Sequence, residues 1–169
     1  MTKIYRRIAE WNRFCRPLNR KTVGFVPTMG ALHDGHASLI ARSKKENEIT
    51  VVSIFVNPTQ FGDPMDMEKY PRTDAKDLEL LKSLGVDAVL WPPFHELYPD
   101  GYAYRVTENS LSLDLCGKSR PGHFDGVLSV VLKLFGLVKP TRAYFGEKDF
   151  QQLKLIEGMV RSFFLDIEI

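Results

Sequence analysis

Cysteine is scarce in this sequence of 169 residues, which contains only Cys15 and Cys116. The two form neither a CxxC pair nor a metal-ligand spacing, so they predict no disulfide framework and no zinc site. We interpret both as reduced thiols and expect a cytoplasmic protein.

Excess charge of one sign and long hydrophobic runs are also lacking. Lys and Arg number 23 against 21 Asp and Glu, for a net charge of +2, which does not indicate a nucleic-acid or membrane surface. The longest apolar stretch, VLSVVLKLFGLV, is interrupted by Lys133 and is too short to span a bilayer. We therefore expect small-molecule or protein partners, with no nucleic acid and no membrane.

Apolar runs rich in β-branched residues alternate with helical patterns over a length of about one domain. Because each run is nearly continuous, as in strands covered on both faces, the pattern predicts an α/β fold. We expect a doubly wound, Rossmann-like parallel sheet with helices on both faces. The expected strands are 22–26, 49–56, 86–91 and 141–145, and the expected helices are 37–45, 74–84, 124–138 and 149–164.

The ends of the chain and one connection carry weaker patterns. Ile4, Ile8 and Trp11 recur at helical spacing and predict a surface helix. The stretch after Trp91, PPFHELYPDGYAY, predicts a surface loop, and the final DIEI alternates as a strand does.

Polar segments marked by Gly or Pro follow three of the four expected strands. They are PTMGALHDGH, NPTQFGDP and FGEKDFQQ. Since parallel strands end at one edge, where ligands bind in this architecture, we expect these segments to meet there.

The first segment places His33 and His36 at the start of a helix, with Gly30 and Gly35 around them. A glycine turn that opens a helix presents free backbone N–H groups and a positive dipole end, which favour a phosphate. Imidazoles at i and i+3 face the same side and can stabilise charge around phosphorus. The alternative interpretation is a turn with a helix cap. The sequence has neither GxxxxGK[ST] nor GxGxxG, so a nucleotide site depends on this HxGH arrangement.

The other segments offer polar groups with two interpretations each. Arg120 and His123 fit either a phosphate contact or an exposed basic loop. Lys148 can hold phosphates and Asp149 can accept ribose hydroxyls, although Asp149 is equally suited to cap a helix. Gln60 can donate and accept at once, which suits a hydroxy-acid substrate.

Taken in order, five motifs closely resemble those of the pantoate–β-alanine ligase (pantothenate synthetase) family: PTMGALHDGH, FVNPTQF, YPRT, RPGHFDGV and FGEKDFQQL. HxGH alone marks a broad superfamily of nucleotidyltransferases and class I aminoacyl-tRNA synthetases, whereas the set is specific and spans 22–169. The resemblance implies a ligase that forms a carbon–nitrogen bond in pantothenate biosynthesis, on the coenzyme A pathway. The carboxylate of (R)-pantoate attacks the α-phosphorus of ATP and releases pyrophosphate. The amine of β-alanine then attacks the pantoyl-adenylate and releases AMP and pantothenate.

The resemblance also implies a role for each matching position. Two stretches contact ATP: Met29, Gly30, Ala31, Leu32, His33, Asp34, Gly35 and His36, then Gly146, Glu147, Lys148 and Asp149. His36 is the proton donor and His33 the second catalytic histidine. Gln60 and Gln152 hold pantoate, Gln60 also lies near β-alanine, and Arg120 and His123 are triphosphate or lid contacts. No metal ligand is assigned, and Mg²⁺ is expected to accompany ATP.

The family continues past this sequence with a small C-terminal domain bearing a Ser-Ser-Arg motif that closes over the triphosphate. We therefore interpret residues 1–169 as the N-terminal nucleotide- and pantoate-binding domain, which binds ligands with little or no turnover. The family is dimeric through this domain, so a homodimer is expected. Two alternatives remain: another HxGH adenylyltransferase, and a non-catalytic nucleotide-binding or dimerisation module.

Overall fold

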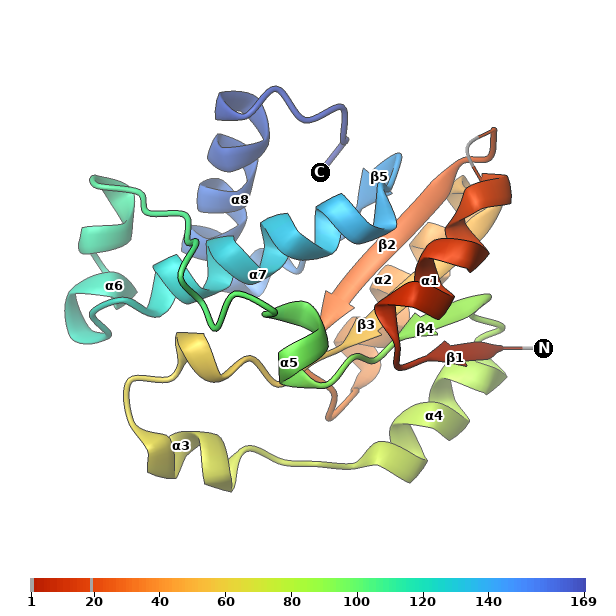
Figure 1. The fold of residues 1–169 in the computed structure, drawn as a ribbon, viewed down its shortest axis with the longest axis horizontal. Helices are drawn as coiled ribbons and strands as arrows, with labels where there is room; N and C mark the ends of the chain where they lie inside the picture. The colour runs from red at the N-terminus through yellow and green to blue at the C-terminus, as the bar shows by residue number, and fades with distance from the viewer. Residues whose placement is uncertain (1, 19) are drawn as a thin grey trace.

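The computed structural model describes residues 2–18 and 20–169, which form an α/β domain around a five-stranded parallel sheet (Figure 1). The strands lie in the order β1-β4-β3-β2-β5. Their bounds are β1 (Lys3–Tyr5), β2 (Val23–Thr28), β3 (Ile49–Ile54), β4 (Ala88–Leu90) and β5 (Arg142–Ala143). Every pairing between these strands is parallel, so the predicted fold class is confirmed.

Helices connect the strands and cover both faces of the sheet. The longer helices are α1 (Ile8–Cys15), α2 (Asp34–Glu46), α4 (Asp74–Ser83), α7 (His123–Val138) and α8 (Phe150–Ser162). The shorter ones are α3 (Pro64–Lys69), α5 (Phe94–Leu97) and α6 (Cys116–Ser119), with 3-10 turns η1 (Arg16–Leu18), η2 (Pro58–Gln60), η3 (Leu111–Leu113) and η4 (Glu147–Asp149). In Figure 1, α7 passes in front of the sheet and α2 lies behind it. Over residues 2–18 and 20–169, no helix is both long enough and apolar enough to cross a membrane.

Each face of the sheet has its own hydrophobic core, because successive strand residues point to opposite sides. Phe25 and Val51 pack with side chains of α1, α7 and α8 on one face. Their neighbours Val26 and Val52 pack with side chains of α2 and α4 on the other face. The strands are therefore apolar at consecutive positions, which is the pattern that predicted them.

The N-terminal helix predicted from Ile4, Ile8 and Trp11 is confirmed only from Ile8 onward. Residues Lys3–Tyr5 form strand β1, which pairs with β4, and α1 begins only at Ile8. Trp11 is fully buried, and its indole N–H donates to the Leu137 carbonyl at 2.9 Å. The helical spacing of Ile4 is misleading because pairing with β4, which is distant in the sequence, determines the backbone conformation of residues 3–5.

Two further predictions concern segments without a strong pattern. The stretch after Trp91 is more than a surface loop, since it contains α5 and buries Leu97 and Tyr98. The strand-like end of the chain is confirmed as a single bridge: Glu168 donates its N–H to the Thr141 carbonyl and accepts from the Ala143 N–H.

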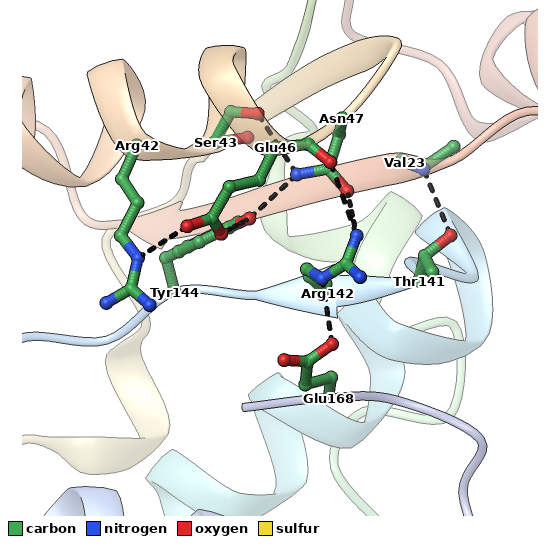
Figure 2. A network of polar contacts seen from close by, with 9 residues as sticks. All are labelled: Val23, Arg42, Ser43, Glu46, Asn47, Thr141, Arg142, Tyr144 and Glu168. Carbon is green, nitrogen blue, oxygen red and sulfur yellow. Dashed lines mark hydrogen bonds and ion pairs between the residues drawn. The ribbon is translucent and has the colours of Figure 1, made fainter.

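The short edge strand β5 is fastened to the end of α2 by a polar network (Figure 2). The Tyr144 hydroxyl accepts from Asn47 Nδ2 at 2.7 Å and donates to the Glu46 carboxylate at 2.8 Å. Arg142 Nε pairs with the Glu168 carboxylate at 2.8 Å. These contacts hold β5 beside β2, although only Arg142 and Ala143 belong to the strand.

Candidate functional site

The carboxyl ends of β2, β3 and β4 meet at one edge of the sheet, and the segments that follow them line a cavity of about 320 Å³. Residues 29–31, 54–56 and 91–94 form one side of it, and residues 71–74 with Asp77 form another. The predicted meeting of loops is thus confirmed for those after the first two expected strands. The segment that follows β5 does not line this cavity.

The turn between β2 and α2 has two consecutive residues in the left-handed region, Gly30 at φ 86° and Ala31 at φ 50°. A residue with a side chain rarely adopts this conformation without compensation. The compensation comes from Asp77 on α4, whose carboxylate accepts the N–H groups of Ala31 and Leu32, both at 2.9 Å. The hydroxyl of Thr73 donates to the same carboxylate at 2.9 Å.

His33 and His36 both belong to the start of α2, which begins at Asp34 rather than at the predicted Ala37. His33 is the N-cap, and its Nδ1 accepts the Gly35 N–H at 3.0 Å. His36 Nδ1 in turn accepts the His33 N–H at 3.4 Å. The turn therefore contains both a helix cap and two neighbouring imidazole rings, whose centroids lie 4.1 Å apart.

This reciprocal cap fixes which nitrogen of each ring carries the proton. A nitrogen that accepts a hydrogen bond has no proton, so each neutral ring is protonated at Nε2. Burial lowers the pKa of His36 below its ordinary value, the neighbouring His33 lowers it further, and Asp77 opposes both. The neutral form is thus favoured, and His36 keeps an Nε2–H donor at the positive end of a helix.

Gln60 ends η2 after β3 and is buried beside a residue that sequence reasoning missed, Asn57. Asn57 Nδ2 donates to Gln60 Oε1 at 3.2 Å and to the Gly126 carbonyl at 3.1 Å. Asn57 belongs to the same NPTQ motif as Gln60. Its position directly after an expected strand was the sequence feature that could have identified it as a site residue.

His123 lies beside Gln60, with its Nδ1 2.8 Å from the Gln60 carbonyl. The two line a smaller cavity of about 160 Å³ together with Arg105 and Asp125. Burial lowers the pKa of His123, the Gln60 carbonyl raises it, Arg120 lowers it and Asp149 raises it. Because a carbonyl only accepts, Nδ1 carries the proton and Nε2 is the acceptor of the neutral ring.

The segment after β5 is exposed from Gly146 to Phe150. The side chains of Lys148 and Asp149 form no hydrogen bond to other described residues, and Asp149 precedes α8 without a side-chain cap bond. Gln151 is buried and donates to the Leu111 and Asp114 carbonyls, both at 2.8 Å. Gln152, the residue expected to hold pantoate, is only partly buried.

A parallel sheet whose inner strand β2 runs through a left-handed turn into a histidine-capped helix defines an HxGH-type nucleotide-binding domain. Within that class, the chain belongs to the pantoate–β-alanine ligase family. The family model described as pantoate-beta-alanine ligase matches residues 3–169.

Individual relatives agree with this assignment. The pantothenate synthetase of Bdellovibrio bacteriovorus is 58% identical over 169 residues, and that of Coxiella burnetii is 54% identical over 169 residues. The match covers 100% of this chain in both cases, but 67% and 65% of the relatives. The chain therefore spans about two thirds of the length of these relatives.

Solved structures give the same result. The Francisella tularensis pantoate–β-alanine ligase, solved in complex with β-γ ATP and β-alanine, superimposes with a TM-score of 0.97 at 46% identity. The match covers 100% of this chain and 66% of that one. The Thermus thermophilus pantothenate synthetase gives a TM-score of 0.92 at 47% identity, covering 98% of this chain and 59% of that one.

Proposed function

We propose that this chain provides the nucleotide- and pantoate-binding domain for the ATP-dependent condensation of (R)-pantoate with β-alanine. The family match over 3–169 carries the proposal, and the histidine-capped turn is the matching chemistry. The reaction forms pantoyl-adenylate and pyrophosphate first, and pantothenate and AMP second. The complex of the Francisella relative with β-γ ATP and β-alanine supports both substrates.

The turn suits the first step because negative charge accumulates on the phosphate oxygens as the pantoate carboxylate attacks the α-phosphorus. The Nε2–H groups of His33 and His36, together with the N-terminal amides of α2, would stabilise that charge without reorganisation. His36 would act as the donor toward the phosphate by giving a hydrogen bond through its Nε2–H group. The protein needs no covalent nucleophile, since AMP is the activating group and the amine of β-alanine is the second nucleophile.

The remaining assignments follow the family. Residues 29–36 and 146–149 would contact ATP, with Lys148 as a point charge on the phosphates and Asp149 on the ribose. Gln60 and Gln152 would hold pantoate, with Gln60 near β-alanine. Arg120 and His123 would contact the triphosphate or act within the lid.

Three broader expectations belong to the same proposal. ATP would enter as its magnesium complex, with the ion held by phosphate oxygens. The chain would be a homodimer, which analytical ultracentrifugation would show as twice the mass of 19.3 kDa. The protein would act in the cytoplasm.

Ligand titration and isotope exchange test the proposed function. By calorimetry, chain 1–169 should bind ATP and (R)-pantoate, while pantoate-dependent exchange of pyrophosphate into ATP stays far below that of full-length relatives. In the full-length protein, His36→Ala should lower turnover by about 10²–10⁴, as for loss of one charge-stabilising group.

The control is His95→Ala, which removes an exposed histidine from α5. Its activity and thermal midpoint should be those of the unmodified protein. Pyrophosphate exchange by chain 1–169 at the rate of full-length relatives would contradict the proposal that this chain binds ligands with little or no turnover. A thermal destabilisation of His36→Ala that accounts for its lost turnover would make His36 a structural residue.

A further inference from the structure

A buried hydrogen-bond chain leads to Gln60 from Tyr98 through Asn57, and neither Tyr98 nor Asn57 has a role assigned above. Tyr98 is 2% exposed, and its hydroxyl donates to Asn57 Oδ1 at 3.2 Å. Asn57 is 1% exposed and donates through Nδ2 to Gln60 Oε1 at 3.2 Å. Tyr98 thus reaches the Gln60 carboxamide through one intermediate side chain.

The orientation of the Asn57 amide follows from its partners. Its Oδ1 accepts the Thr59 hydroxyl at 3.0 Å and the Thr59 N–H at 3.4 Å, in addition to the Tyr98 hydroxyl. Its Nδ2 faces the Gly126 carbonyl, which can only accept. A flipped amide would place an oxygen against the carbonyl and an N–H₂ group against the Thr59 N–H.

The orientation of Asn57 then decides that of Gln60. Because Asn57 offers a donor, Gln60 turns its Oε1 toward it, and the Gln60 N–H₂ group is left for another partner. Among residues 2–18 and 20–169, no group accepts a hydrogen bond from Gln60 Nε2. Gln60 lines the cavity of about 160 Å³, so a ligand there meets a donor.

The Tyr98 ring is itself held on two sides. Lys133 Nζ lies 4.8 Å from the ring centroid and pairs with the Asp100 carboxylate at 2.8 Å. Phe94 stacks on the ring at a centroid distance of 4.9 Å. Burial raises the pKa of Tyr98 to about 12, so its hydroxyl remains a donor throughout the neutral range.

We infer that Tyr98 is a positioning residue that, through Asn57, aims the Gln60 N–H₂ group at the substrate. The substrate group that meets Gln60 is therefore a hydrogen-bond acceptor, a carboxylate or hydroxyl oxygen. The identity of that substrate as (R)-pantoate rests on the proposed function, whereas the orientation of Gln60 does not.

Calorimetry on chain 1–169 tests the inference with Tyr98→Phe, which removes the hydroxyl and keeps the ring. We expect about 5- to 10-fold weaker binding of (R)-pantoate and unchanged binding of ATP, in line with loss of one buried hydrogen bond. The control is Tyr144→Phe, which removes the hydroxyl of another buried tyrosine; that hydroxyl forms two partly buried hydrogen bonds in the network that holds β5 (Figure 2). It should lower thermal stability without weakening pantoate binding.

A double-mutant cycle separates positioning from general destabilisation. In a Gln60→Ala background, Tyr98→Phe should have no further effect on pantoate binding, because it acts through the missing carboxamide. An undiminished effect in that background, or an equal loss of ATP affinity, would overturn the inference.

A ligand-free measurement keeps the inference distinct from the proposed function. The side-chain N–H₂ resonances of Gln60, assigned by their disappearance in Gln60→Ala, should shift or broaden in Tyr98→Phe and remain in place in Tyr144→Phe. Unchanged Gln60 resonances in Tyr98→Phe would overturn the inference. If the unmodified chain fails to bind pantoate, the proposed function fails and the resonances alone decide the role of Tyr98.

Discussion

Asp77 stabilises the strained turn on which both histidines depend. Its carboxylate accepts three hydrogen bonds, from the Ala31 and Leu32 N–H groups and the Thr73 hydroxyl, and the residue is 3% exposed. Ala31 can therefore stay at φ 50°, because two amides that would otherwise lack partners are bound to a buried anion.

We predict that Asp77→Asn lowers the free energy of unfolding by about 2–4 kcal/mol, because an amide nitrogen replaces one acceptor and the charge is lost. Chemical denaturation measures the change. The matched control is Glu79→Gln, an exposed carboxylate on the same helix, which should change stability by less than about 0.5 kcal/mol. Equal effects of the two variants would rule out a special role for Asp77.

The importance of Asp77 could not be predicted from the sequence, whereas the proximity of His33 and His36 could be predicted. His33 and His36 lie within one helical turn, so their spacing already places them on one side. Asp77 is 46 positions from Ala31, and only the packing of α4 beside the turn brings its carboxylate there. Acidic residues near the start of a helix, as in α4, are favoured by the helix dipole and by themselves indicate no such role.

At the scale of elements, α7 packs closely against η2 at Gly126. A Cβ atom on Gly126 would lie 2.4 Å from the Thr59 carbonyl oxygen and 2.7 Å from the Gln60 Cα. The helix can approach only because this residue lacks a side chain, and the approach allows Asn57 to donate to the Gly126 carbonyl. The position of Gln60 thus depends on a glycine in a different element.

We predict that Gly126→Ala destabilises the protein by about 1–3 kcal/mol through overpacking and weakens binding of (R)-pantoate by displacing Gln60. Gly136→Ala is the control within α7, since a Cβ there would meet nothing within 4 Å. It should raise stability by about 0.5–1 kcal/mol through helix propensity. Thermal unfolding measures the stability of both variants, and calorimetry measures their pantoate binding. Stability changes of the same sign in the two variants would contradict the packing argument.

At the scale of the whole molecule, two half-buried histidines couple folding to pH. Burial lowers the pKa of both His36 and His123 below the ordinary value of 6.5. Below that value the unfolded chain binds protons that the folded chain does not, so stability falls as pH falls. The contribution is present above pH 6.5 and is lost on acidification through the lowered pKa values.

We predict that the thermal midpoint of chain 1–169 decreases as the pH is lowered from 7 to 5. Each histidine should lower the free energy of unfolding by at most about 1.4 kcal/mol per pH unit. The double variant His36→Gln, His123→Gln should show a flatter profile over the same interval. His95→Gln, an exposed change, should leave the profile as it is. An equally steep profile in the double variant would show that other groups cause the acid sensitivity.

The sequence by itself determined the parallel α/β class, the order of the main elements and the histidine turn, because these depend on local periodicity and on residues a few positions apart. Tertiary structure decided that residues 3–5 join the sheet, that Asp77 holds the turn, and that Tyr98 and Gly126 position Gln60. Each of those contacts joins segments far apart in the chain. Local sequence patterns do not predict such contacts, because the contacts form only when the sheet and its helices pack together.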